Sequence, residues 1–184
     1  MKKFVCFVLI AMICLVAVGC GNDIEIPDGM KLASGDEELY YFFVPLSWEV
    51  KRGYDMPYAY YSAGDPSNVN VTVYYPEDLK VETTTESTTD PRNPYIDAYW
   101  AMFTGEAANL NEFTLVETKD AKLGGVYAEE FIYTEKTGGT VYRHRAAVTY
   151  HGGLIFSLTY TSTEANFDIH QGDVNSIFKE FKLK

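Results

Sequence analysis

Cysteine is nearly absent from this chain, and the few cysteines that occur lie at one end. The sequence holds three, Cys6, Cys14 and Cys20, so none follows residue 20. A domain without thiols has no disulfide, no thiol nucleophile, no cysteine zinc site and no iron–sulfur cluster. Its fold must be held by the apolar core alone. A chain of this length can do so because it buries about 70% of its unfolded surface.

Basic residues are scarce as well. Lys and Arg total 15 against 26 Asp and Glu, which gives a formal net charge of −11 over 184 residues. Binding to nucleic acid, or to anionic lipid by charge, needs clustered lysine and arginine, so the composition argues against both. The hydrophobic fraction of 47% argues against a disordered chain, and the length favours a single domain.

The N-terminus has the parts of a secretory signal. Two lysines precede an apolar run over residues 4–18, which is shorter than the roughly 20 residues of a membrane-spanning helix. Ala17 and Gly19 ahead of Cys20 resemble the bacterial lipobox, although leucine is usual where Ala17 stands. The resemblance implies cleavage before Cys20 and a diacylglycerol on its thiol. An ordinary secreted protein cut near Ala17 or Gly19 and a membrane-anchored chain are the alternatives.

The sequence divides into three parts. Residues 1–19 are predicted to be the lipoprotein signal peptide, residues 20–38 an acidic tether and residues 39–184 one domain. The tether is predicted because residues 22–38 carry six acidic side chains against Lys31 alone and show little apolar periodicity. Its charge would keep the segment solvated and lift the domain off the membrane.

Alternating and helical patterns define the elements of the domain. Runs rich in β-branched and aromatic residues predict about seven antiparallel strands, and two apolar stripes predict helices. One helix is expected from Pro94 behind the cap Asn93, and the last from Ser162 or Thr163 onward. The pattern favours an α+β fold with a central antiparallel sheet of six to seven strands and helices packed on its faces. The expected strands are residues 39–44, 57–62, 69–75, 113–118, 126–133, 141–150 and 154–160.

A family resemblance supports this arrangement. The run Tyr41 to Trp48, YFFVPLSW, resembles the strand–Pro–x–x–Trp opening of Mog1/PsbP-like domains. The later order of hairpin, helix, Gly124-Gly125, meander and terminal helix agrees over residues 39–184. The resemblance implies an α/β/α sandwich with helices against both faces of the sheet. The family includes bacterial lipoproteins, and its better-known members act as binding or assembly factors without a shared catalytic site, so no functional residue is carried over.

Residue types that carry chemistry are few. His144, His151 and His170 lack the short spacing of a zinc site, and the chain has no G-x-S-x-G elbow and no EF-hand ligand order. We therefore expect no metal and no cofactor apart from the covalent lipid on Cys20, and no enzyme.

Arg143 and Arg145 form the one basic cluster. In a strand these two arginines share a face, and His144 points to the other. Glu129 and Glu130 on the preceding strand offer cross-strand ion pairs, whereas an anion-binding role is the functional alternative.

Tyrosine is abundant, with 15 in the chain and eight between Tyr40 and Tyr75. In residues 69–75, the valines and Tyr75 share one face, which should be buried, and Asn70, Thr72 and Tyr74 share the other. This second face suits a partly wet contact surface. Tyr58 and Tyr60 can extend it from the neighbouring strand. The alternative is that a helix covers the face and Tyr74 belongs to the core.

These features favour an extracytoplasmic domain held to a bacterial membrane by lipid, which binds a protein partner or assists an envelope complex without catalysis. The second interpretation is a small-ligand or carbohydrate receptor that uses the tyrosine-rich face and the Arg143/Arg145 patch. The third is a hydrolase, which a cleft with two carboxylates or a His–acid pair of shifted pKa would support.

Lipidation can be tested directly. Intact-mass analysis of the natural protein should find a diacylglyceryl adduct on a chain that begins at Cys20. Cys20→Ala should leave an unlipidated precursor, because only the thiol can form the thioether. A natural protein without lipid would contradict the prediction.

Overall fold

The computed structural model describes residues 24–52, 57–79, 81, 93–110 and 112–184. Seven strands form one antiparallel sheet in the order β4-β5-β6-β10-β9-β8-β7, and two strand pairs, β1-β3 and β11-β2, lie apart from it. The elements are β1 (Met30–Leu32), β2 (Tyr40–Tyr41), β3 (Phe43–Pro45), β4 (Glu49–Arg52), β5 (Pro57–Ser62), β6 (Asp65–Tyr74), the 3-10 helix η1 (Pro76–Asp78), α2 (Pro94–Leu110), β7 (Thr114–Leu123), β8 (Val126–Thr137), β9 (Thr140–His151), β10 (Leu154–Thr163), α3 (Gln171–Glu180) and β11 (Lys182–Leu183).

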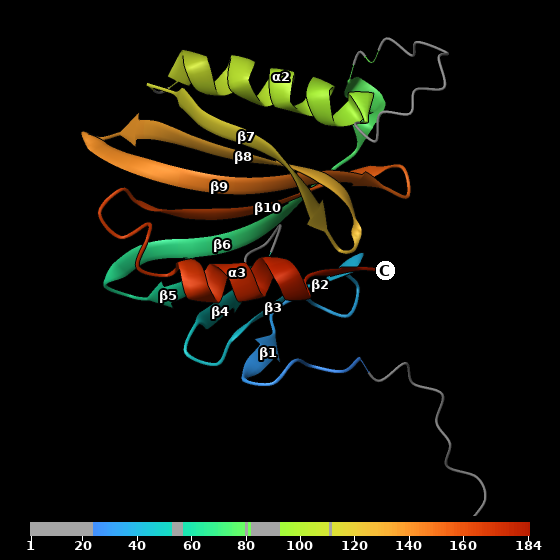
Figure 1. The fold of residues 1–184 in the computed structure, drawn as a ribbon, viewed down its shortest axis with the longest axis vertical. Coiled ribbons are helices and arrows are strands. Elements are labelled where there is room, and N and C mark those ends of the chain that lie inside the picture. Colours follow the sequence, from blue (N-terminus) through green and yellow to red (C-terminus); the bar gives the residue numbers. More distant parts are fainter. Residues whose placement is uncertain (1–23, 53–56, 80, 82–92, 111) are drawn as a thin grey trace, which may run out of the picture.

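Two helices pack on opposite faces of this sheet. In Figure 1, α2 runs along the top of the view and α3 lies lower, beside β5 and β6. The core on the α3 side joins sheet residues such as Val71 and Leu158 to Ile177 of the helix and to Trp48. The core on the α2 side joins Phe131, Val148 and Ile155 to Ile96 and Tyr99 of the helix. The predicted antiparallel sheet with a helix on each face is therefore present.

The cap predicted for α2 is also present. The backbone N–H of Tyr95 donates to the side-chain oxygen of Asn93 at 2.9 Å, and Pro94 occupies the first helical position. Proline fits there because its missing N–H would have no partner inside the helix.

The predicted tether differs from the structure over residues 30–34. Met30–Leu32 pairs with β3, and Ala33 and Ser34 are fully buried. The Ala33 N–H donates to the Phe42 carbonyl at 2.7 Å, and the Ser34 hydroxyl accepts the Phe42 N–H at 3.1 Å. The packed domain therefore begins ahead of the predicted boundary at Leu39. The strand was not predicted because it has only three residues, of which Met30 and Leu32 are apolar, and acidic residues surround it.

Three other boundaries differ from the prediction. Residues 39–44 form two short strands rather than one. The β5–β6 turn is shorter than expected because β6 starts at Asp65, and β6 ends at Tyr74, so Tyr75 is exposed instead of buried. The last helix starts at Gln171 rather than at Ser162 or Thr163. Ser162 is buried in β10, where its hydroxyl lies 2.7 Å from that of Ser67, and this contact holds the strand in place of a helix cap.

Three hairpins of the meander turn through glycine pairs of the same conformation. The first glycine has a φ of +60° at Gly124, +60° at Gly138 and +58° at Gly152. These angles belong to the turn that matches the twist of antiparallel strands, and side chains rarely adopt them. Gly124 differs from the other two in its surroundings, because a Cβ built there would lie 2.8 Å from Leu183 of β11.

This difference gives a stability test. Gly138→Ala and Gly152→Ala should each cost about 1 kcal/mol of unfolding free energy from backbone strain. Gly124→Ala should cost about 1–3 kcal/mol more, because the added methyl group also displaces β11. Chemical denaturation of the three variants measures the comparison. Equal losses at all three positions would show that β11 does not pack against this turn.

Candidate functional site

Among the described residues, α2 covers only part of its side of the sheet. A helix with its side chains is about 10 Å wide, whereas strands are about 4.8 Å apart, so one helix covers two or three strands. The sheet residues that pack under α2 come mainly from β8, β9 and β10. Toward β5 the same face continues with half-buried polar side chains. We call these residues the open face: Tyr58, Tyr60, Asn68, Asn70, Thr159 and Thr161.

Strand pairing fixes the open face as two rows. In the first row, Asn70 of β6 lies between Tyr58 of β5 and Thr159 of β10. In the second row, Asn68 of β6 lies between Tyr60 of β5 and Thr161 of β10. Side chains on opposite residues of paired strands point to the same side of a sheet. The register that the sequence left undetermined therefore places Tyr58, Tyr60 and Asn70 on one surface, as the contact-surface interpretation requires.

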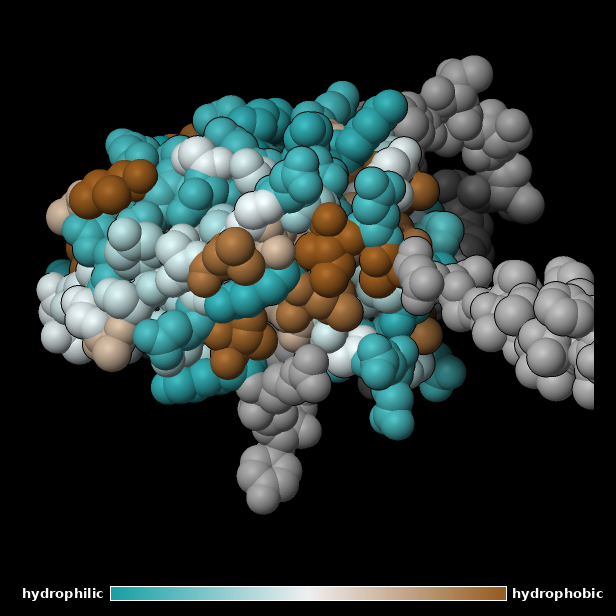
Figure 2. All heavy atoms as spheres, turned by 90° about the horizontal axis from the view of Figure 1, so that it is seen from below, coloured by the Kyte–Doolittle hydropathy of each residue, from teal (hydrophilic) through white to brown (hydrophobic). Residues whose placement is uncertain are grey.

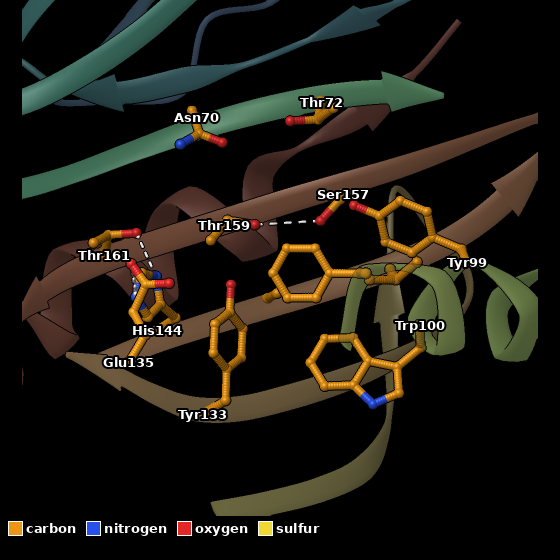
Figure 3. A pocket seen from close by; sticks show the side chains of 13 residues that line it. Asn70, Thr72, Tyr99, Trp100, Tyr133, Glu135, His144, Ser157, Thr159 and Thr161 are labelled. Carbon is orange, nitrogen blue, oxygen red and sulfur yellow. Dashed lines mark hydrogen bonds and ion pairs between the residues drawn. The ribbon is translucent and has the colours of Figure 1, made fainter. Parts of the chain in front are cut away.

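A pocket of about 270 Å³ lies where the open face meets α2. Its aromatic wall consists of Tyr99, Trp100 and Phe103 from α2 and Tyr133 from β8. Figure 3 shows the rings of Tyr99, Trp100 and Tyr133 facing a row of hydroxyl and amide groups on β6 and β10. The polar row consists of Asn70, Thr72, Ser157, Thr159 and Thr161.

His144 stands at the rim of this pocket between two oxygen-bearing side chains. Its Nδ1 lies 2.9 Å from the Thr161 hydroxyl, and its Nε2 lies 3.5 Å from the Glu135 carboxylate. The ring stacks on Tyr133 at 4.5 Å, nearly parallel. Burial lowers the pKa of His144 to about 4, so the imidazole is neutral at neutral pH.

This cluster has the residue types of a hydroxyl–imidazole–carboxylate relay, but the Nε2 of His144 makes no hydrogen bond among the described residues. Acyl transfer would also need N–H donors for the developing oxyanion. Thr161 lies in β10, which pairs with β6 on one side and β9 on the other, so the backbone N–H groups around it belong to the sheet ladder. A histidine with a pKa of about 4 is also a weak base. The arrangement is better suited to hydrogen bonding a ligand than to catalysis.

A second His–acid pair lies on the α3 side of the sheet. His170 Nε2 is 2.9 Å from Asp65 Oδ2, and the His170 ring contacts Tyr61 at 4.1 Å. Burial alone would raise the pKa of Asp65, but hydrogen bonds from Ser67 and His170 lower it to about 2. The pair joins the start of β6 to the residue that precedes α3, which is a structural role.

Arg143 and Arg145 lie on the α3 side, opposite His144, as their spacing predicts. Arg145 is 2.9 Å from the Glu130 carboxylate and donates to the Asn175 side chain at 2.6 Å. The Arg143 guanidinium lies 4.7 Å from the Phe167 ring centre. The sheet therefore separates this pair from the tyrosine-rich face, so a single receptor site cannot use both. The cross-strand ion pair with Glu130 explains Arg145 without an anion.

The tyrosines of the candidate surface have different surroundings. Tyr60 donates a hydrogen bond to Glu49, and the Lys51 ammonium lies 4.7 Å from the Tyr60 ring centre. Tyr58 lies 6.2 Å from Tyr60 between ring centres. Tyr74 is half-buried and packs beside Tyr99 of α2 at 6.0 Å. A helix thus covers the Tyr74 end of the face and leaves the Tyr58 end outside it.

Sequence reasoning missed the aromatic wall. Trp100 and Phe103 follow the helical spacing of a core stripe, and their spacing gives no sign that part of the stripe borders a pocket. The side chain of His144 was placed on the correct face, but its neighbours Glu135 and Thr161 lie nine and seventeen positions away in the sequence.

Two features are absent from the described part of the chain. No three His, Cys, Asp or Glu side chains there are grouped so that they could hold a metal ion. No helix there is long and apolar enough to cross a membrane. Cys20 lies outside the described residues.

Comparison with known proteins identifies the fold. No protein-family model and no curated protein matches the chain. Cyanobacterial PsbP (CyanoP) from Synechocystis sp. PCC 6803 is similar in structure, with a TM-score of 0.57 at 16% identity over 90% of this chain and 97% of that protein. The Ran-binding protein Mog1p of Saccharomyces cerevisiae has a TM-score of 0.52 at 7% identity over 84% and 95%. The chain has the Mog1/PsbP-like fold, as the sequence resemblance implied.

The buried imidazole predicts a pH dependence of stability. Below pH 6.5 the unfolded chain binds a proton at His144 and the folded chain does not until about pH 4. The unfolding free energy should therefore fall as the pH is lowered from 6.5 to about 4. The expected contribution of His144 to this loss is on the order of 3 kcal/mol. His144→Phe keeps a ring against Tyr133 without titrating, so its profile should be flatter.

Denaturation at several pH values measures both profiles. His151→Phe, at the exposed end of β9, is the matched control for the loss of a histidine. A His144→Phe slope equal to that of the natural protein would show that His144 does not contribute.

Proposed function

We propose that this protein is a bacterial lipoprotein, anchored through diacylglycerol on Cys20, whose domain binds another protein of the envelope without catalysis. The open face is the proposed contact surface. The domain of the lipoprotein would lie on the extracytoplasmic side of the membrane, because the predicted secretory signal and the lipobox-like residues direct export. No nucleic acid and no cofactor apart from the lipid takes part.

The observation that carries this proposal is the composition of the open face. Six half-buried tyrosine, asparagine and threonine side chains lie in two straight rows on paired strands. Tyrosine is enriched at protein interfaces because it contributes a large apolar area and a hydroxyl group at a low cost in side-chain entropy. Glu49 and Lys51 on β4 lie opposite Tyr60 and Tyr58 and border the open face with charge. A polar rim beside a less charged centre is typical of protein interfaces.

The fold gives further support. Mog1p, which has this fold, is a Ran-binding protein by name. Protein binding is thus within what the fold does. The lack of available N–H donors around Thr161 favours binding over the hydrolase interpretation.

The exterior also agrees with anchoring by lipid rather than by the domain. Figure 2 shows the surface from below, where apolar side chains stand in small groups among hydrophilic ones. Exposed large apolar residues include Ile26, Leu39, Leu46 and Ile169. Small separated groups of this kind are ordinary on soluble domains and do not bury a domain in a bilayer.

Site-specific photocrosslinking in intact cells tests the proposal. A benzoylphenylalanine in place of Tyr58 should give a discrete protein adduct with the full-length lipoprotein. The control is the same residue in place of Val116, which is 51% exposed on β7 at the other edge of the sheet. Adducts of equal intensity at both positions, or none at Tyr58, would contradict the open face as the contact surface.

A further inference from the structure

Polar side chains line the pocket beside α2. Tyr133 is 4% exposed, and its hydroxyl points toward the polar row (Figure 3). The Asn70 amide and the Thr72 hydroxyl belong to that row and are half-buried. The Nε2 of His144, which also lines the pocket, is buried without a hydrogen-bond partner among the described residues. Hydroxyl and amide groups that face a pocket can donate hydrogen bonds to a ligand and accept them from it.

The opposite wall is rigid and aromatic. Trp100 stacks on Phe131 at 3.9 Å, and Phe103 lies edge-on to Tyr133 at 5.5 Å. These contacts hold the rings in place before any ligand arrives, which reduces the entropy lost on binding. A pocket with an apolar wall on one side and a row of hydroxyl and amide groups on the other complements a ligand that is apolar on one face and polar on the opposite one.

Charge narrows the ligand class. The described residues that line the pocket include no lysine or arginine, and His144 is neutral at neutral pH. Glu135 is the acidic residue of this lining, and it lies beside His144. Phosphates and carboxylates are therefore disfavoured, because nothing in the pocket compensates a negative charge.

The volume of the pocket limits the size of the ligand. The volume of about 270 Å³ lies just below the range found for small-molecule sites, about 300–1,000 Å³. It suits a single six-membered ring rather than an extended chain.

We propose that this pocket binds a neutral polyhydroxylated ring, the pyranose unit of a saccharide, with its C–H face on the aromatic wall and its hydroxyl groups on Asn70, Thr72 and Tyr133. Two hydroxyl neighbours, Ser157 and Thr159, already lie 3.2 Å from each other and extend the polar row. This site lies beside the Tyr58 end of the open face and shares Asn70, Thr159 and Thr161 with that face.

Saturation-transfer NMR on the full lipidated protein, in a detergent without a sugar headgroup, tests the proposal. The probes are glucose and N-acetylglucosamine, with glucose 6-phosphate as the anionic counterpart and choline as the cationic one. We expect saturation transfer to a neutral sugar, with affinity in the millimolar range, and none to the phosphate. Trp100 emission should change in the same titration, since Trp48 is fully buried on the other side of the sheet.

Variants then locate the site. Thr72→Val and Tyr133→Phe each remove one hydroxyl at nearly constant shape and should weaken sugar binding about three- to tenfold. Thermal melting checks that both variants remain folded. Tyr58→Phe, on the open face outside the pocket, should bind sugar as the natural protein does.

Three results would overturn the inference. These are no transfer to either neutral sugar, binding to choline instead, or sugar binding that neither pocket variant reduces. The crosslink at Tyr58 gives a separate readout, because Thr72→Val should leave it intact. If the protein with the crosslinker at position 58 and no other change gives no adduct, that result would contradict the protein-binding proposal and not the sugar-binding proposal.

Discussion

The alternation of side chains along the central strands is the constraint on which the rest of this structure depends. β10 pairs with β6 on one side and β9 on the other, so every residue in it is assigned to one face or the other. Leu158 and Tyr160 belong to the core on the α3 side, whereas Thr159 and Thr161 between them belong to the α2 side. A slip of one residue would exchange an apolar layer for a polar one, so the register is strongly fixed.

The two faces then acquire different roles because their coverage differs. The α3 side is covered by α3 and also by the N-terminal residues around Phe42 and Trp48, which form one core with it. On the α2 side, the described residues contribute one helix to a sheet of seven strands. On the parts of β6 and β10 that α2 does not cover, the side chains on this face are threonine and asparagine instead of valine. The pocket lies at this transition, and its two-sided lining is a direct result.

Much of this could be predicted from residue patterns. The valines of β6 alternate with Asn70 and Thr72, and the structure places them on the two expected faces. Asn93 and Pro94 fix the start of α2, and three glycine pairs mark the turns of the meander. The predictions from the sequence were wrong mainly for short elements and for the start of the last helix. Residues 30–34 looked like solvated linker because acidic neighbours surround them, and Ser162 looked like a helix cap because its burial against Ser67 involves a residue 95 positions away.

The sequence by itself determined that the domain has no thiols and has an α+β fold, which follows from period-two and helical patterns. It also predicts a secretory signal with a candidate lipidation cysteine. These are local properties, set by neighbouring residues and by the geometry of a strand or a helix. Only the tertiary structure decided which polar residues meet. It brought Glu135, His144 and Thr161 together, placed Trp100 opposite Thr72, and set Arg145 on the far side of the sheet. Contacts of this kind depend on strand order and on where α2 packs, and no local pattern specifies either of them.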